Sequence, residues 1–90
     1  MARASVDPEE LRRFARDLTR FNAQLEEMMG ALSARTHQLA ESWRDAEHRK
    51  FVEEMARTSK ALGQFVQMSN EHAAFLVKKA GHVDAYLNQR

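Results

Sequence analysis

Large apolar side chains recur along this chain at alternating steps of three and four residues. Because an α-helix has about 3.6 residues per turn, positions with this spacing share one side of a helix. The first run consists of Leu11, Phe14, Leu18, Phe21, Leu25, Met28, Leu32 and Leu39. Only one Pro and three Gly are present, so few positions interrupt a helix. The pattern therefore predicts an all-α protein made of a few long helices.

The second half of the chain carries two neighbouring apolar rows. One row continues the alternation of three and four, and its apolar members are Phe51, Met55, Leu62, Phe65, Leu76, Val83 and Tyr86. The other row repeats every seven residues and consists of Val52, Val66, Ala73, Ala80 and Leu87, with Ser59 in the missing place. A single helix over this segment would present two apolar sides.

Capping residues mark where the two helices begin. Asp7 can accept hydrogen bonds from free backbone N–H groups, and Pro8 suits the first helical position. The apolar pattern changes phase around residues 42–45, where both Ser42 and Asp45 are suitable caps for a second helix. We predict one domain over residues 1–90, with helices over about 7–41 and 47–88 and a turn over about 42–46.

Reversal of the chain at this turn would pack the two helices antiparallel. Pairing of their apolar rows sets Phe14 near Phe75 and Leu76, and Leu18 near His72. Packing of the two helices against each other covers only one apolar row on each. The second row of the later helix, which repeats every seven residues, would therefore stay in water unless another chain covered it. We therefore predict an antiparallel helix-turn-helix hairpin, of which two copies or two related chains form a four-helix bundle. The predicted dimer or partner interface consists of Met29, Val52, Val66, Ala73, Ala80 and Leu87.

Composition and spacing argue against several classes of function. Fourteen basic and thirteen acidic residues give a net charge of +1, which is too small to attract nucleic acid. There is no cysteine, and no two histidines lie three or four residues apart. We expect no catalytic residues, no cofactor and no metal. No apolar run is long enough for a membrane helix, and residues 1–5 show no signal-peptide core, so we expect no membrane insertion.

Arginines gather near the start of the predicted first helix, at Arg12, Arg13, Arg16 and Arg20. Such a patch could dock an acidic partner or nucleic acid. Acidic residues are interleaved with it, among them Glu10 and Asp17, so we interpret the patch chiefly as a solvated helix face.

Two aromatic residues flank the predicted turn. Trp43 lies in the turn, Ala46 follows it, and Phe51 comes eight residues after Trp43. With its length and its two predicted helices, the chain resembles the WXG family, the ESAT-like helical hairpins associated with type VII secretion. The family's Trp-x-Gly corresponds here to Trp43-Arg44-Asp45. The resemblance implies a turn motif of Trp43, Arg44, Asp45 and Phe51, a dimeric hairpin, and a non-enzymatic function as a secretion substrate or partner.

Two interpretations of Trp43 stay open at this point. The indole either covers the end of the bundle over Leu39, Ala46 and Phe51, which we favour, or it anchors a partner. In the family that the chain resembles, the same turn helps form a surface cleft with the end of the partner's helix. Both interpretations are therefore compatible with one fold.

Many members of that family carry a Tyr-x-x-x-Asp/Glu export signal after the second helix. Here Tyr86 is followed four residues later by Arg90, so the signal is not matched. We expect the chain to stay in the cytoplasm when it is expressed alone, and to be secreted only with a partner that carries the signal. The alternative function is a soluble intracellular adaptor that binds a partner helix and has no connection to export.

Overall fold

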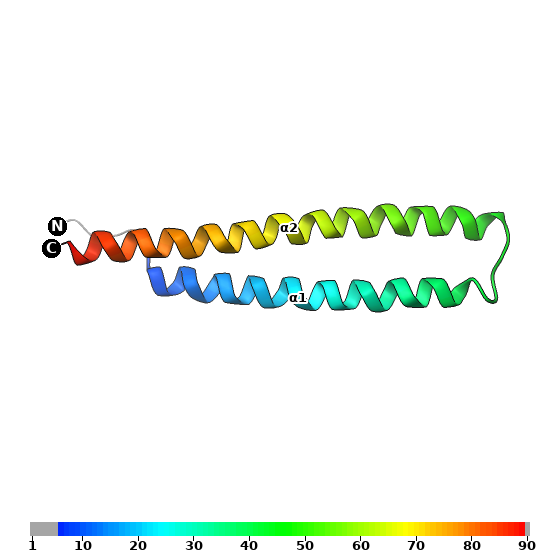
Figure 1. Cartoon of the computed structure of the whole chain (residues 1–90), viewed down its shortest axis with the longest axis horizontal. Coiled ribbons are helices and arrows are strands. Elements are labelled where there is room, and N and C mark those ends of the chain that lie inside the picture. Colours follow the sequence, from blue (N-terminus) through cyan, green and yellow to red (C-terminus); the bar gives the residue numbers. More distant parts are fainter. Residues whose placement is uncertain (1–5, 90) are drawn as a thin grey trace.

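A computed structural model, which describes residues 6–89, shows two long helices joined by a short turn (Figure 1). Helix α1 spans Pro8–Leu39 and helix α2 spans Ala46–Asn88. They run antiparallel, and α2 extends beyond the start of α1 at the open end of the hairpin. The rod measures 69 × 16 × 14 Å. The all-α hairpin expected from the sequence is confirmed, with α1 ending two residues earlier than predicted.

Side chains cap both helix starts. The carboxylate of Asp7 accepts a hydrogen bond from the backbone N–H of Glu9 at 2.9 Å, and Pro8 occupies the first helical position. The carboxylate of Asp45 accepts one from the N–H of His48 at 3.0 Å. Each cap satisfies a backbone donor that has no partner within its helix. Within residues 6–89, neither helix is both long and apolar enough to cross a membrane.

The two helices meet along a row of mostly small side chains. The buried residues of this contact are Ala15 and Asn22 of α1 and Val66, Ser69, Ala73 and Ala80 of α2. Alanine and serine keep the side chains at a helix contact short, and the distance between helix axes depends on those side chains. The hairpin is therefore held by close packing of the helices along this row.

The contact row differs from the one that the apolar pattern suggested. Leu11, Leu18 and Leu25 are only half-buried, whereas Phe14 and Phe21 are exposed. The prediction that the row of large residues forms the seam is thus wrong for Phe14, Phe21, Met28 and Leu32, which are all at least half exposed. The physical reason is that the helices centre their contact on the small residues one position further round, and the large rings then project to the side.

Candidate interaction surface

An apolar groove runs along one side of the helix contact. Its volume is about 380 Å³, and its lining residues are Phe14 and Leu18 of α1 with Phe65, Met68, Ser69, His72 and Leu76 of α2. Phe14 and Leu76 line the same groove as Leu18 and His72, in agreement with the register predicted from the sequence. The groove is lined almost wholly by large side chains, so it offers an apolar surface.

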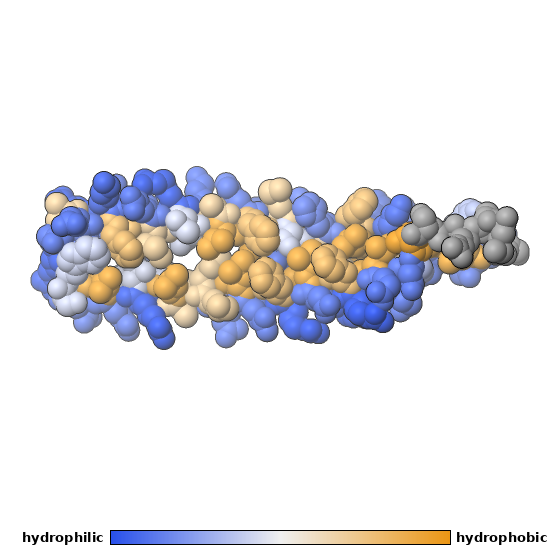
Figure 2. All heavy atoms as spheres, turned by 180° about the vertical axis from the view of Figure 1, so that it is seen from behind, coloured by the Kyte–Doolittle hydropathy of each residue, from blue (hydrophilic) through white to orange (hydrophobic). Residues whose placement is uncertain are grey.

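The same side of α1 carries more large side chains that the hairpin leaves uncovered. Phe14, Phe21 and Met28 follow at steps of seven residues and are 58%, 51% and 66% exposed. Seven residues make nearly two helical turns, so these side chains form one row, which Leu32 extends. We define the aromatic face as Phe14, Phe21, Met28 and Leu32 of α1 with Phe65, Met68 and His72 of α2. Figure 2 shows one face of the hairpin, along which hydrophobic residues form a band over both helices.

The residues that the sequence assigned to a partner interface lie in different places. Val66, Ala73 and Ala80 are 3%, 5% and 0% exposed and are buried between α1 and α2. The prediction that their row stays uncovered without a second chain is therefore wrong. It failed because this row, and not the neighbouring one, faces α1. Of the other three predicted residues, Met29 is half-buried, whereas Val52 and Leu87 are exposed.

Three rings pack together where the chain reverses. The ring centroid of Trp43 lies 5.5 Å from that of Phe51 and 5.1 Å from that of His48, and both pairs are tilted. These distances fall in the range at which aromatic rings attract one another. The indole is half-buried, so it covers the end of the hairpin and keeps an accessible edge. The contribution of His48 was not predicted from the sequence.

Aspartate replaces the motif glycine without backbone strain. Asp45 has φ −92° and ψ −175°, an extended conformation that any residue adopts. Among the described residues no glycine or other residue has a positive φ. Arg44 adds a hydrogen bond from its Nε to the carbonyl oxygen of Ala40 at 3.1 Å, near the end of α1. The sequence Trp43-Arg44-Asp45 therefore forms a stable turn in which Asp45 caps α2.

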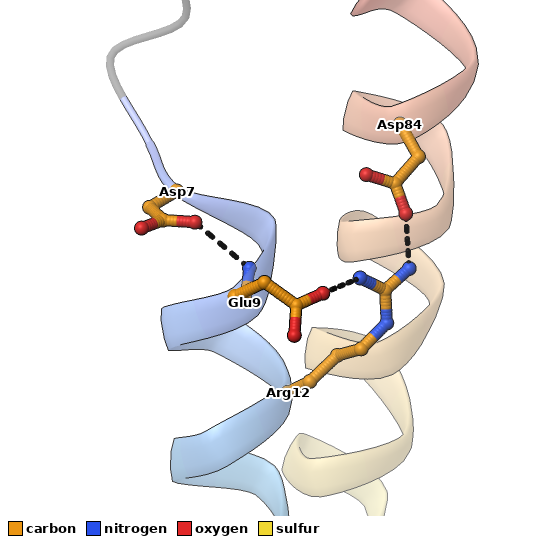
Figure 3. Close-up of polar contacts among 4 residues, drawn as sticks. All are labelled: Asp7, Glu9, Arg12 and Asp84. Carbon is orange, nitrogen blue, oxygen red and sulfur yellow. Dashed lines mark hydrogen bonds and ion pairs between the residues drawn. The ribbon is translucent and has the colours of Figure 1, made fainter.

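A charged cluster joins the two helices at the open end of the hairpin (Figure 3). The guanidinium of Arg12 donates to the carboxylate of Asp84 on α2 and, at 2.8 Å, to that of Glu9 on α1. The hydrogen bond to Asp84 raises the pKa of Arg12, and the contact with Glu9 acts in the same direction. Arg12 thus bridges the two helices. This role was not predicted from the sequence, where Arg12 was interpreted only as part of a basic patch.

A polar pair interrupts the packed row near its middle. Asn22 is 1% exposed, and its amide group donates to the side-chain oxygen of Asn70 across the helix contact at 2.9 Å. The side-chain oxygen of Asn22 has no hydrogen-bond partner among the described residues, so this alignment pairs only its amide N–H group, which misalignment would leave unpaired as well. This pair and the Arg12 bridge therefore fix the register of α1 against α2.

Comparison with known proteins identifies the family. The pattern of the WXG100 family, "Proteins of 100 residues with WXG", matches residues 3–85. The chain belongs to the WXG100 family. It is thus a helical-hairpin protein of the ESAT-like, type VII secretion-associated group, in which dimers form. No curated protein sequence matches this WXG100 chain.

Solved structures show the same fold. Wild-type EsxB, described as a secreted protein from Bacillus anthracis strain Sterne, is 23% identical, with a TM-score of 0.80 over 93% of this chain and 97% of the other. Its selenomethionine-labelled form is 22% identical, with a TM-score of 0.81 over 96% of this chain and 98% of the other. At this identity the likeness establishes the hairpin fold, and it does so over nearly the full length of both chains.

Proposed function

We propose that this WXG100 hairpin works by pairing, and that two copies associate through their aromatic faces into a four-helix bundle. The observation that supports the proposal is the row Phe14, Phe21 and Met28, which is more than half exposed although it lies beside the hairpin's own contact. Exposed apolar rows of this extent mark association surfaces in soluble proteins. A second hairpin would cover both helices at once, as in other four-helix bundles.

The charge of the chain permits pairing with itself. Its net charge is +1, so two copies carry little mutual repulsion. The aromatic face includes one titratable side chain, His72, and no acidic residue that would need a partner when buried. These features support a homodimer, and pairing with a related hairpin would use the same surface.

Sedimentation equilibrium of the purified chain tests the pairing directly. The chain mass is 10.4 kDa, and we expect twice this value at micromolar concentration. A stably folded, monodisperse species of 10.4 kDa would overturn the proposal. Repeating the run at two salt concentrations separates apolar association, which salt does not weaken, from association through charges.

We further propose that the paired hairpin is the form that a type VII system handles, and that it acts as a substrate or partner and not as an enzyme. EsxB, whose fold it shares, is described as secreted. The expectation that export needs a partner stays a prediction, because Arg90 lies outside the described residues. Fractionating a tagged strain that lacks other Trp-x-Gly genes tests it. Most of the protein in the medium would show that no related partner is needed.

A further inference from the structure

A second groove lies on the other side of the helix contact. Its volume is about 610 Å³, and its lining residues are Ala15, Arg16, Thr19, Arg20 and Ala23 of α1 with Asn70, Ala73, Ala74 and Val77 of α2. Phe14 and Arg16 flank the buried Ala15, and each is rotated by about 100° from it in opposite directions round the helix. Dimerisation through the aromatic face would therefore leave this groove open.

Small side chains extend the groove along both helices. On α1, Gly30 follows Ala23 by seven residues; on α2, Gly63 precedes Asn70 by seven and Gly81 follows Ala74 by seven. Residues seven positions apart lie on one side of a helix. The three glycines therefore lie on the same sides of α1 and α2 as the residues that line the groove. A Cβ atom added at any of them would meet nothing within 4 Å. The hairpin itself therefore does not require glycine there.

The groove also has a definite charge. Arg16 and Arg20 lie one turn apart and are the only ionisable residues that line it. Arg16 makes no ion pair within residues 6–89, and the contact of Arg20 with Asp17 is 3.7 Å long between two exposed side chains. Exposed pairs of this kind contribute little, so both guanidinium groups are available to carboxylates.

We propose that this groove, here called the small-residue groove, binds one acidic amphipathic helix of a partner protein. A third helix fits along the furrow between two antiparallel helices, and short side chains let its backbone come close. On α1 the groove extends from Arg16 to Gly30, a length of about 21 Å, which corresponds to about four helical turns. Carboxylates one turn apart on the partner helix would match Arg16 and Arg20, and its apolar side chains would cover the alanine floor. The inference goes beyond the proposed pairing and does not depend on it.

Two synthetic peptides provide the probe. Both are fluorescein-labelled helices of about 18 residues with one leucine row, and they differ only in carrying glutamates or lysines one turn apart beside that row. Fluorescence anisotropy with the full chain measures their binding. We expect the acidic peptide to bind about tenfold more tightly than the basic one, because two exposed charge pairs favour it.

Three variants decide whether the peptide lies in the small-residue groove. Arg16→Glu/Arg20→Glu should reverse the preference between the two peptides, a result that misfolding cannot produce. The control Lys50→Glu/Arg57→Glu changes the same charge on exposed positions outside the groove and should keep the acidic preference. Ala74→Leu fills the groove and should weaken binding of both peptides about tenfold or more.

Several results would contradict the proposal that the small-residue groove binds an acidic helix. Equal binding of the two peptides, or an unchanged preference in Arg16→Glu/Arg20→Glu, shows that the groove does not select acidic helices. Binding that survives Ala74→Leu and disappears in Phe21→Glu places the peptide on the aromatic face instead. Sedimentation of the same samples reports dimerisation separately, so a failure of this inference and a failure of the proposed pairing give different results.

Discussion

The two sides of the hairpin differ in the size of their side chains, although both border the same helix contact. The aromatic face presents phenylalanine and methionine over both helices, and the small-residue groove presents mainly alanine, with one threonine, one asparagine, one valine and two arginines. Apolar area favours association in proportion to the surface removed from water, so the aromatic face suits an extended contact with a second hairpin. The groove suits a single helix that approaches closely. One hairpin thus offers two surfaces, of which one suits a second hairpin and the other suits a single partner helix.

The largest expected effect comes from a substitution that places a charge on the aromatic face. Phe21→Glu would bury a carboxylate without a partner in the dimer, and we expect the dimer dissociation constant to rise about 1000-fold, equivalent to about 4 kcal/mol. Sedimentation equilibrium measures the change as a shift from twice 10.4 kDa to 10.4 kDa.

Ala23→Glu is the matched control for this variant. It introduces the same charge two residues further along α1, at an exposed position in the small-residue groove. We expect it to leave the dimer mass unchanged. If both variants dissociate the dimer, the two faces do not differ as described, and the pairing surface includes the groove.

Two neighbouring alanines separate the helix contact from the groove beside it. Ala73 is 5% exposed between the helices, and Ala74 is exposed. Leucine at position 73 must displace α1, and we expect a loss of about 1–3 kcal/mol in the free energy of unfolding. Leucine at position 74 projects outward and should change it by less than about 0.5 kcal/mol. Urea unfolding at one fixed protein concentration measures both, because dimerisation makes the stability depend on concentration.

Comparable losses for the two variants would contradict the description of the contact. They would mean that the helices meet one position further round α2 than the structure shows. A small loss for Ala73→Leu alone would show that the hairpin is loose enough to admit a larger side chain at its centre.

Much of the fold was predictable from the sequence, because it depends on local signals. The caps Asp7 and Asp45 and the loss of phase near Ser42 located both helices, and the two apolar rows predicted their approximate antiparallel register. Which row faces inward was not predictable in the same way. Hydrophobicity favours burial of large side chains, whereas close helix approach favours small ones, and the periodic pattern does not say which effect dominates.

The contacts between distant residues were the hardest to predict. The bond from Asn22 to Asn70 and the bridge from Arg12 to Asp84 depend on the register to within one helical turn. The sequence placed the helices opposite each other only approximately, so neither polar pair could be selected from the many that such a register allows. A search for asparagines or opposite charges at positions facing each other across the hairpin would have included both pairs among its candidates without singling them out.

The turn lies outside both the aromatic face and the small-residue groove. The variant Trp43→Ala tests how much the indole contributes to the stability of the hairpin and to its dimerisation. Full burial of the indole would imply a loss of about 3–5 kcal/mol for Trp43→Ala. Because the ring is half-buried against His48 and Phe51, we expect a smaller loss, about 1–2 kcal/mol. Thermal unfolding measures it. Loss of the dimer with a melting temperature that falls no further than in the dissociated variant Phe21→Glu would show that the indole serves mainly as an anchor.

The smallest expected effect is a gain in stability and not a loss. It concerns Gly63, which precedes Asn70 of the small-residue groove by seven residues. Gly63 lies within α2, and a Cβ atom added there meets nothing within 4 Å. Alanine restricts the unfolded chain more than glycine does and fits a helix equally well, so Gly63→Ala should stabilise the hairpin by about 0.5–1 kcal/mol. This corresponds to a rise of about 3–6 °C in the melting temperature. A fall would mean that another part of the chain already occupies the space beside Gly63, and that the groove ends before this turn of α2. A rise together with weaker binding of the acidic helix would show that the glycine serves the groove at the expense of the stability of the hairpin.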